Sequence, residues 1–276
     1  MCSYINFFGY PLSSYGLMVA LGVITCVIYA FIQYRKQSEV KDYALIFCTL
    51  WIGLGIFIGS HILYGITNIS KIIQVLSDIP RYFADFSVGI SILGTLIGGM
   101  VFYGGLIGGA IAAVLYLKLT KKDVALYCDF LVPCIPLFHF FGRIGCFLGG
   151  CCYGMEFPIG FTYTDSIVAE ANGVCRLPLP LIEAFFNILI FILLVACYNK
   201  HKIKKGHLIL VYCFTYPIVR FIDEFFRGDA IRGFWGPFST SQWISLVIFS
   251  VALIYVIIGK IKGINFINKK PEAVIE

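Results

Sequence analysis

The sequence contains few charged residues. Charged side chains make up 13% of the 276 residues and hydrophobic ones 59%, whereas soluble proteins carry about 25% charged residues. The apolar residues form long runs instead of amphipathic stripes, which excludes an ordinary soluble fold and indicates a chain embedded in a bilayer. We expect no detachable secretory signal, because the stretch from Met1 to Ser14 is short and lacks a basic start.

Two further features are missing, an internal repeat and a regularly spaced set of cysteines. Without a repeat, residues 1–276 are expected to form a single integral membrane domain. The 11 cysteines are scattered, mostly in apolar stretches, where cysteine acts as a small hydrophobic side chain, so they do not indicate a disulfide framework. The formal charge of +6 does not predict nucleic-acid binding, because the basic residues cluster at the ends of apolar runs, where membrane topology explains them.

The apolar runs predict an all-α, polytopic helical bundle. A helix needs roughly 20 apolar residues to cross a bilayer. Basic residues follow alternate runs, and the positive-inside rule makes those loops cytoplasmic. We therefore expect an outer N-terminus, a cytoplasmic C-terminus, and longer polar loops on the outer side at 67–90, 149–178 and 223–239. The expected transmembrane helices, about seven in number, are residues 14–34, 43–66, 91–117, 124–148, 179–199, 207–226 and 240–260.

The fourth apolar run contains an arginine. His139, Arg143 and Cys146 are spaced i, i+4 and i+7, which places them on one face of a helix. An arginine at membrane depth costs at least about 2.5 kcal/mol unless it is paired or hydrated. A functional role is therefore favoured, and snorkelling of the side chain to a headgroup is the alternative. Neighbouring glycines, Gly154 among them, allow a backbone or a ligand to approach closely.

The sixth run ends in a second group of charges. Arg220, Glu224 and Arg227 also recur at i, i+4 and i+7, so we expect one helix face on which Glu224 can pair with either arginine. A structural ion pair at the membrane boundary is the alternative. Two arginines against one glutamate leave an excess positive charge, and guanidinium groups match the geometry of phosphate oxygens. The pattern predicts an anionic headgroup at this position.

A glycine-rich stretch and a tyrosine also qualify as candidates. Tyr103 precedes Gly104 and Gly105, and glycines in a membrane helix favour close helix packing, or else expose backbone N–H groups to a lipid headgroup. Tyr15 lies at the outer end of the first run, where a lone tyrosine is usually an interfacial anchor.

A further candidate is a cluster of cysteines, Cys146, Cys151 and Cys152. Its spacing is not a standard zinc-binding pattern, so we expect no metal. A disulfide involving Cys175 and a reactive thiol near Arg143 both stay open.

Several motifs follow one another in a characteristic order. They are Ser14-Tyr15-Gly16-Leu17-Met18, Gly104-Gly105-Leu106-Ile107-Gly108, Gly142-Arg143-Ile144-Gly145, Pro178-x-x-Leu181-x-Glu183 and Arg220-Phe221-x-x-Glu224-Phe225-x-Arg227, followed by Gln242 and Ser245. Together they resemble the motifs of prolipoprotein diacylglyceryl transferases, from about Tyr15 to Ser245. The resemblance implies seven spans with an outer N-terminus, in agreement with the positions of the charges.

The resemblance also implies a function. Members of this family are transferases of lipoprotein biosynthesis in the bacterial cytoplasmic (inner) membrane. They move a diacylglyceryl group from phosphatidylglycerol to the lipobox cysteine of a prolipoprotein signal peptide. By resemblance, Arg143 binds the phospholipid, Arg220 is catalytic, and Tyr15, Gly154 and Glu224 match important positions. Further substrate-binding candidates are Gly104, Gly105 and Arg227. We expect membrane lipids as partners, but no cofactor, metal or nucleic acid.

The chain departs from the family pattern at four positions. Tyr103 stands where the family usually presents a histidine that is often proposed as the base. Cys146 and Cys151 replace an asparagine and a glutamate, and His61 replaces an arginine. Tyr103 therefore remains a catalytic candidate, and we hypothesise that His139 takes over as base, because a neutral imidazole accepts a proton near pH 7. A histidine that is hydrogen-bonded inside the bundle is the alternative.

Two other functions stay open at this point. A diverged member of the family could alkylate another acceptor, such as a glycan or a small thiol, and the cysteine-rich stretch 146–152 supports this alternative. A non-enzymatic lipid-binding protein or transporter is the other possibility. The sequence has neither an inverted repeat nor a matching pair of broken helices, which speaks against a transporter.

Overall fold

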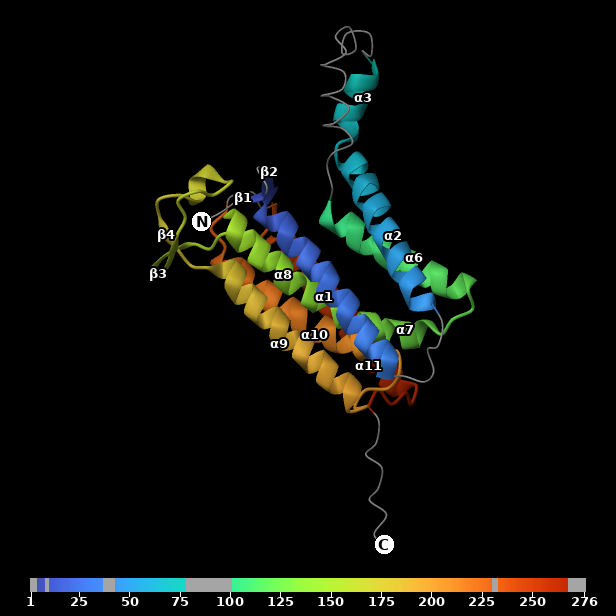
Figure 1. Ribbon diagram of the computed structural model, residues 1–276. Coiled ribbons are helices and arrows are strands. Elements are labelled where there is room, and N and C mark those ends of the chain that lie inside the picture. The colour runs from blue at the N-terminus through green and yellow to red at the C-terminus, as the bar shows by residue number, and fades with distance from the viewer. Residues whose placement is uncertain (1–3, 8–9, 37–42, 78–100, 230–232, 268–276) are drawn as a thin grey trace. The chain divides into compact units, whose positions relative to one another are not determined.

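The computed structural model describes residues 4–7, 10–36, 43–77, 101–229 and 233–267. The chain divides into two compact units, of which the larger is Met1–Glu39 with Ala125–Glu276 and the smaller is Val40–Val124. Helices dominate both units (Figure 1). Three two-stranded antiparallel sheets accompany the helices of the larger unit.

The helices of the larger unit pack in succession. α1 (Ser14–Lys36) packs against α8 (Cys134–Gly149), and α8 packs against α9 (Leu179–Asn199). α10 (Leu208–Asp223) packs against both α9 and α11 (Thr240–Ile261), and the short helix α7 (Val124–Leu131) precedes α8. Large apolar side chains remain exposed along these helices, as expected where the surrounding medium is lipid.

The core of this unit lies where the turn between α7 and α8 meets α9 and α10. Val132, Ile190, Leu194 and Leu208 form its buried centre. Beside it, Asp129 on α7 accepts the backbone N–H of Leu208 at 3.1 Å and that of Gly206 at 2.6 Å. A carboxylate at a helix N-terminus satisfies free N–H groups and the helix dipole, so Asp129 fixes the position at which α10 begins.

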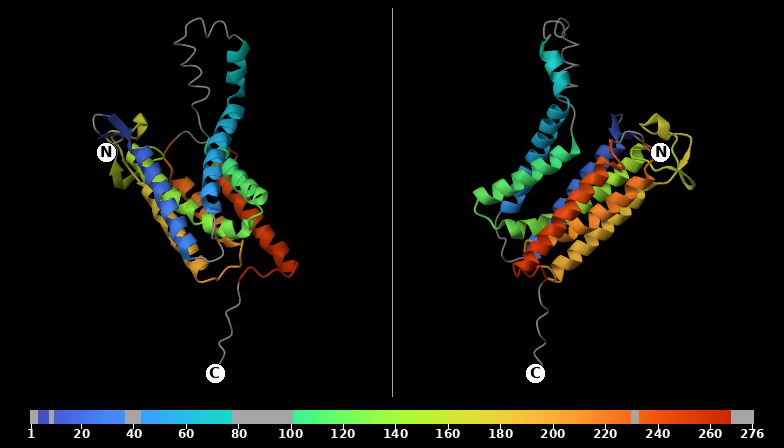
Figure 2. Two further views of the ribbon diagram at one scale, coloured as in Figure 1. Left: turned by 45° about the vertical axis from the view of Figure 1, so that its right-hand side comes forward. Right: turned by 180° about the vertical axis from the view of Figure 1, so that it is seen from behind.

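Small hairpins gather at the opposite end of the larger unit (Figure 2). β1 (Tyr4–Phe7) and β2 (Tyr10–Ser13) precede α1, and β5 (Phe234–Trp235) and β6 (Phe238–Ser239) precede α11. Between α8 and α9 lie β3 (Glu156–Thr162), the 3₁₀ turn η1 (Ala169–Ala171) and β4 (Cys175–Arg176). The expectation of an all-α chain omitted these hairpins, although helices still form most of the structure.

The smaller unit contains α2 (Ala44–Thr67), α3 (Ile69–Ser77) and α6 (Phe102–Leu119). Glycines bring α2 and α6 into backbone contact. A Cβ atom added to Gly59 would lie 2.3 Å from the carbonyl oxygen of Gly104, and one added to Gly108 would lie 2.2 Å from that of Gly55. The expected close packing at the glycine-rich stretch is confirmed, because no other residue fits at such an approach.

Five helices of the described residues are long and apolar enough to cross a membrane: Ser14–Gln33, Ala44–Thr67, Val124–Gly149, Leu179–Asn199 and Thr240–Ile261. A shorter apolar helix covers Gly104–Leu119, and its expected start at residue 91 lies outside the described residues. α10 has 16 residues. The chain is therefore a multi-pass helical membrane protein, while the number seven and the orientation stay predictions.

The predicted span 124–148 agrees with the observed apolar span Val124–Gly149. A turn at Val132 and Pro133 divides it into α7 and α8, because proline lacks an N–H and disfavours a helical conformation of the residue before it. The predicted polar loop 67–90 begins with a helix, α3, and the rest of that loop from residue 78 onward lies outside the described residues.

Candidate active site

One helix, α8, carries three of the candidate residues. His139, Arg143 and Cys146 lie on successive turns of this helix, as their spacing predicts. The His139 ring is tilted against the Tyr216 ring of α10, with 5.2 Å between ring centres. These contacts place His139 inside the bundle, one turn from Arg143. Its role as a base stays a hypothesis.

Tyr15 joins this group because α8 has a glycine at the contact with α1. A Cβ atom added to Gly145 would lie 3.0 Å from Cδ2 of Tyr15 and 3.3 Å from its Cα. The absence of a side chain at Gly145 therefore lets the first turn of α1 approach the last turns of α8. Tyr15 lies beside the helix segment that carries Arg143 and Cys146.

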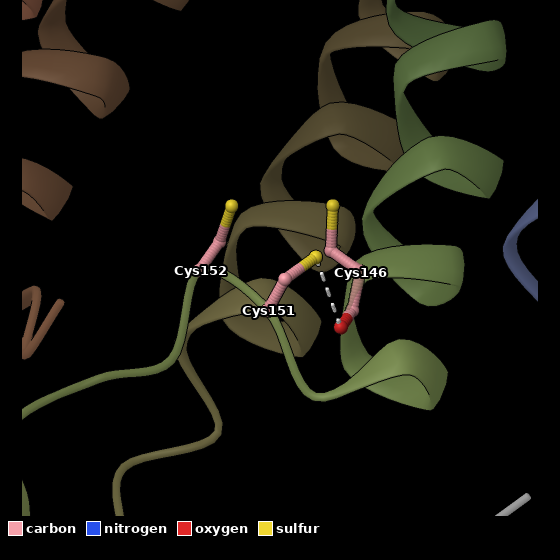
Figure 3. Close-up of side chains that lie close together, drawn as sticks. All are labelled: Cys146, Cys151 and Cys152. Carbon is pink, nitrogen blue, oxygen red and sulfur yellow. Dashed lines mark hydrogen bonds between the residues drawn. The ribbon is translucent and has the colours of Figure 1, made fainter. Parts of the chain in front are cut away.

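Three cysteines converge where α8 ends. The sulfur atoms of Cys146, Cys151 and Cys152 all lie within 4.8 Å of one another (Figure 3). Hydrogen bonds with Cys146 and Cys151, together with the nearby Arg143 and Arg227 guanidinium groups, lower the pKa of the Cys152 thiol below its ordinary value. The sequence spacing indicated no metal site, yet the structure brings the three thiols together.

A buried ionic network connects α8, α9 and α10. Glu183 of α9 is 2% exposed and lies between two arginines. Its Oε1 is 2.9 Å from Nη2 of Arg143 on α8, and its Oε2 is 3.8 Å from Nη1 of Arg220 on α10. A carboxylate in a membrane helix requires such partners. Glu183 therefore brings the two arginines to one place.

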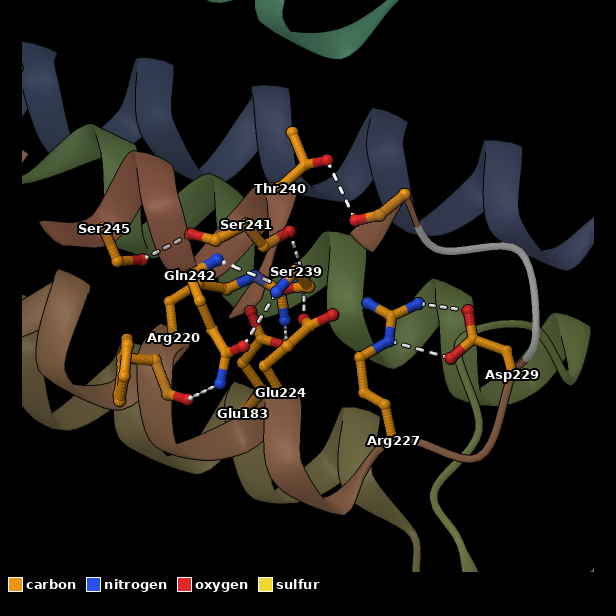
Figure 4. A network of polar contacts seen from close by, with 12 residues as sticks. Glu183, Arg220, Glu224, Arg227, Asp229, Ser239, Thr240, Ser241, Gln242 and Ser245 are labelled. Atoms are coloured by element: carbon orange, nitrogen blue, oxygen red, sulfur yellow. Dashed lines mark hydrogen bonds and ion pairs between the residues drawn. The ribbon is translucent and has the colours of Figure 1, made fainter. Parts of the chain in front are cut away.

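Arg220 is held by two further contacts (Figure 4). Its Nη2 lies 2.8 Å from Oε2 of Glu224 and donates to the Ser241 hydroxyl at 3.0 Å. Gln242 Nε2 donates to the Phe221 carbonyl oxygen at 3.3 Å, so the first turn of α11 is tied to the last turn of α10. Arg220 therefore has little freedom to reorient.

Arg227 departs from its predicted position. α10 ends at Asp223, Glu224–Phe226 form a 3₁₀ turn (η2), and Arg227 has an extended backbone. Arg227 therefore does not continue the helix face of Arg220 and Glu224. Its guanidinium binds the Asp229 carboxylate instead, with 2.8 Å between Nε and Oδ1. The expected excess of positive charge is also smaller, because Glu183 and Asp229 join Glu224 as partners of the arginines.

Two arginine N–H groups retain donor capacity. Nε of Arg143 and Nη1 of Arg220 are buried and make no hydrogen bond to the described residues, although Nη1 lies 3.8 Å from the Glu183 carboxylate. Buried donors are rarely left without an acceptor in proteins. Charge-assisted hydrogen bonds to a phosphate or carboxylate would satisfy both groups. The network can therefore accept an additional anion.

One pocket opens beside Arg220, and a second adjoins it at Thr240. A polar pocket of about 160 Å³ is lined by Arg220, Glu224, Arg227, Gly233, Ser239, Thr240 and Ser241. An apolar pocket of about 550 Å³ shares Thr240 with it and is lined by Trp235, Gly236, Trp243 and Ile244. The first residues of α11 line the polar pocket, and the positive end of a helix dipole favours an anion there. The pair of pockets suits a molecule with an anionic head and an apolar tail.

Gly154 positions the segment that carries Arg227. The two residues form an isolated antiparallel bridge, and the Gly154 N–H donates to the Leu177 carbonyl oxygen at 3.2 Å. A Cβ atom at Gly154 would lie 2.5 Å from that oxygen. Gly154 therefore has a structural reason to be glycine.

Three of the predicted site residues lie in the smaller unit. Tyr103, Gly104 and Gly105 are on α6, and the space beside the two glycines is filled by α2. Their part in catalysis and substrate binding stays a prediction.

Sequence reasoning missed Glu183 as a site residue. The signal was present, because a glutamate within an apolar run is as unusual as an arginine. Asp229 and Ser241 gave no comparable signal, since both are ordinary residues of a polar loop or helix start. A disulfide involving Cys175 was also left open, and in the described part of the chain Cys175 is a free thiol.

Fold and site together define a class of protein: a multi-pass membrane protein with a buried arginine–carboxylate network that can take an anion beside an apolar surface. Comparison with known proteins gives the family. A family model described as prolipoprotein diacylglyceryl transferase matches residues 3–258. The chain belongs to this family, as the resemblance of its motifs suggested.

Individual relatives support the same assignment. The chain is 37% identical over 242 residues to a phosphatidylglycerol–prolipoprotein diacylglyceryl transferase of Clostridium tetani, covering 87% of this chain and 90% of that protein. It is 35% identical over 258 residues to a Clostridium perfringens protein named phosphatidylglycerol–prolipoprotein diacylglyceryl transferase 2, covering 93% and 94%. A Campylobacter jejuni protein with the first of these names is 31% identical over 268 residues, with 94% of each chain covered.

Proposed function

We propose that this chain transfers a diacylglyceryl group from phosphatidylglycerol to the lipobox cysteine of prolipoproteins. The observation that carries the proposal is the Arg143–Glu183–Arg220 network, whose two buried N–H groups retain donor capacity. Phosphatidylglycerol presents a phosphodiester anion of the kind that guanidinium groups bind. The names of the relatives state phosphatidylglycerol as the donor and a prolipoprotein as the acceptor.

The reaction creates negative charge where the arginines lie. The acceptor sulfur attacks the glyceryl carbon that carries the phosphate, the C–O bond breaks, and glycerol phosphate leaves with the electron pair. Arg143 binds the donor phosphate, and Arg220 stabilises the charge that develops on the leaving group. Glu183 and Glu224 hold Arg220 in place, and Tyr15 flanks the site from α1.

The pockets give the donor lipid an orientation. Its phosphate enters the polar pocket beside Arg220 and Arg227. Its apolar part lies along the neighbouring pocket between Trp235 and Trp243, since tryptophan is typical of membrane interfaces.

Proton transfer from the acceptor thiol is assigned to His139, with Tyr103 as the second candidate. His139 lies one turn from Arg143 on α8. Separate His139→Ala and Tyr103→Phe variants test the assignment in a strain that depends on this gene for lipidation. Full activity of the His139 variant would exclude it as the base.

We further propose a single domain with seven spans in the bacterial cytoplasmic membrane, with the N-terminus outside and the C-terminus in the cytoplasm. The basic residues after alternate helices support this orientation. Reporter fusions after Lys36 and Lys205 are expected to report the cytoplasm, and one within 149–178 the outer side.

The central experiment uses purified protein, phosphatidylglycerol labelled in its acyl chains, and a peptide with a lipobox cysteine. Transfer of label to the peptide supports the proposal. A peptide with serine in place of this cysteine is the matched control and should stay unlabelled. Release of glycerol phosphate without peptide labelling would instead favour another acceptor. The thiol-rich end of α8 is the feature that supports this alternative.

A further inference from the structure

The cysteines at the end of α8 have the composition of a metal-binding site. The sulfur atoms of Cys146, Cys151 and Cys152 lie within 4.8 Å of one another. In zinc–thiolate sites the Zn–S distance is about 2.3 Å, which places sulfur atoms about 3.8 Å apart in a tetrahedron. Small side-chain rotations would therefore bring the three sulfurs to bonding distance.

The backbone turns back in order to bring these thiols together. Gly150 ends α8 with φ of 73°, and Cys152 has φ of 56°, a left-handed conformation. Outside glycine, this conformation costs roughly 1 kcal/mol or more and marks functional sites. Cys151 donates to the Cys146 carbonyl oxygen at 3.7 Å, so the loop stays against the end of α8. The strain at Cys152 is an observation independent of the sulfur distances.

The number of ligands distinguishes two kinds of zinc site. Structural sites are closed by four protein ligands, whereas catalytic sites have three and leave the fourth position open. Within the described ranges, no further Cys, His, Asp or Glu ligand atom joins this cluster. The cluster therefore matches the open kind.

We propose that Cys146, Cys151 and Cys152 bind a zinc-class ion as thiolates, and that its open position takes the acceptor thiol. This inference rests on the proposed function, which requires a thiol to become a nucleophile. A thiol that coordinates such a metal loses its proton, and metal coordination activates a nucleophile. The thiol gives its proton to the base that the proposed function assigns, the metal-bound sulfur forms the new C–S bond, and glycerol phosphate leaves with the electrons of the broken C–O bond.

The surrounding charges suit this arrangement. A divalent ion with three thiolates carries one negative charge, and a bound acceptor thiolate adds a second. Arg143 is one turn from Cys146 on α8, and Arg227 is paired with Gly154, two residues after Cys152. Each guanidinium already pairs with a carboxylate, Arg143 with Glu183 and Arg227 with Asp229, so the two arginines offset only part of this charge. The metal site would also lie beside the arginines that hold the donor phosphate.

The first experiment measures metal binding directly. Full-length protein in detergent is reduced, loaded with Zn²⁺, freed of unbound metal and analysed for zinc content. We expect about one ion per chain, and loss of most of it in each of Cys146→Ala, Cys151→Ala and Cys152→Ala. Cys197→Ala is the matched control, because Cys197 is a half-buried cysteine of α9 that packs against the core cluster of the larger unit. Absence of zinc from the reduced protein, or equal zinc in all variants, overturns the proposal.

The second experiment tests the open position. Co²⁺ replaces zinc, and its sulfur charge-transfer band reports each thiolate ligand. The band should increase when a lipobox peptide is added and stay constant with the serine peptide. No change with either peptide overturns the assignment of the open position to the acceptor.

A third measurement separates this inference from the proposed function. If the function holds and the metal takes part, removal of the metal lowers peptide lipidation at least about tenfold, and zinc restores it. Equal lipidation by metal-free protein overturns the inference and leaves the function intact. An increased cobalt band without any lipidation supports the metal site and contradicts the function.

Discussion

Within each of the two units, a different kind of contact holds the helices together. In the larger unit, α8, α9 and α10 meet through buried charges on Arg143, Glu183 and Arg220. In the smaller unit, α2 and α6 meet through glycines, and their backbones touch at Gly59 and Gly104. Glycine contacts stabilise helix pairs in lipid without any polar group. Buried charges contribute little net stability, and in the proposed function they hold the donor phosphate.

This contrast tells us where substitutions affect stability and where they affect chemistry. A change in the glycine contact is expected to alter the packing of α2 against α6. A change in the ionic network alters both packing and the charge available to an anionic substrate. The following predictions test the two regions separately.

The largest effect is expected for Glu183→Ala. It leaves Arg143 and Arg220 buried without their shared carboxylate, which costs about 3–5 kcal/mol, and lipidation is lost. Unfolding in detergent and peptide labelling measure the two effects. Glu156→Ala is the control, because the Glu156 side chain is 70% exposed and lies 3.8 Å from Arg176, and such pairs contribute about 0–1 kcal/mol. Equal stability of the two variants would contradict the account of the network.

Gly59→Ala should have the next largest effect. The new Cβ atom would meet the Gly104 carbonyl oxygen at 2.3 Å, so α2 and α6 must separate, at a cost of about 1–3 kcal/mol. Gly53→Ala on the same helix is the control, since no atom lies within 4 Å of its Cβ position. Thermal unfolding distinguishes them, and a Gly59 variant as stable as the control would show that the backbones do not touch.

An intermediate effect is expected for Ser239→Ala. Ser239 and Gln242 form a capping box at the start of α11, and loss of an N-cap costs about 1 kcal/mol. The same turn carries Ser241, the acceptor for Arg220, so activity should fall together with stability. An unchanged melting temperature would contradict the role of this cap.

The smallest effect concerns Tyr163, which lies in the loop between α8 and α9, outside the spans. Burial raises its pKa to about 12. Because the folded-state pKa exceeds the unfolded one, the free energy of unfolding should be constant below about pH 10 and fall between about pH 10 and 12. Tyr163→Phe should reduce this fall and change stability at pH 8 by less than about 1 kcal/mol. Tyr4→Phe, an exposed tyrosine, serves as control, and an identical alkaline profile for both variants would refute the prediction.

The sequence predicted regular helices well and irregular backbone poorly. The span 179–199 agrees with α9 (Leu179–Asn199), because a continuous apolar run has clear ends. The predicted span 124–148 did not include the turn at Val132 and Pro133, although a proline within a helical run indicates such an interruption. Arg227 was placed on a helix that ends earlier, at Asp223, because helical spacing alone does not reveal where a helix stops.

The site residues were predictable where charges interrupt apolar runs. They were not predictable where a loop folds back against a helix end. Arg143 and Arg220 stood out by this rule, and Glu183 follows from the same rule. The cysteine cluster was not predictable, because its spacing is unusual and depends on left-handed backbone at Gly150 and Cys152. Such a turn cannot be read from hydrophobic periodicity.

The central claim is that Arg143 and Arg220 together hold the phosphate of the donor lipid. The most direct test is the kcat/KM for phosphatidylglycerol of purified Arg143→Lys and Arg220→Lys, measured by peptide labelling beside Arg35→Lys, an arginine in the last turn of α1. Loss of the bidentate guanidinium should reduce kcat/KM by about 10²-fold or more in the first two variants, with Arg35→Lys unchanged. Wild-type kcat/KM in Arg220→Lys would contradict the account.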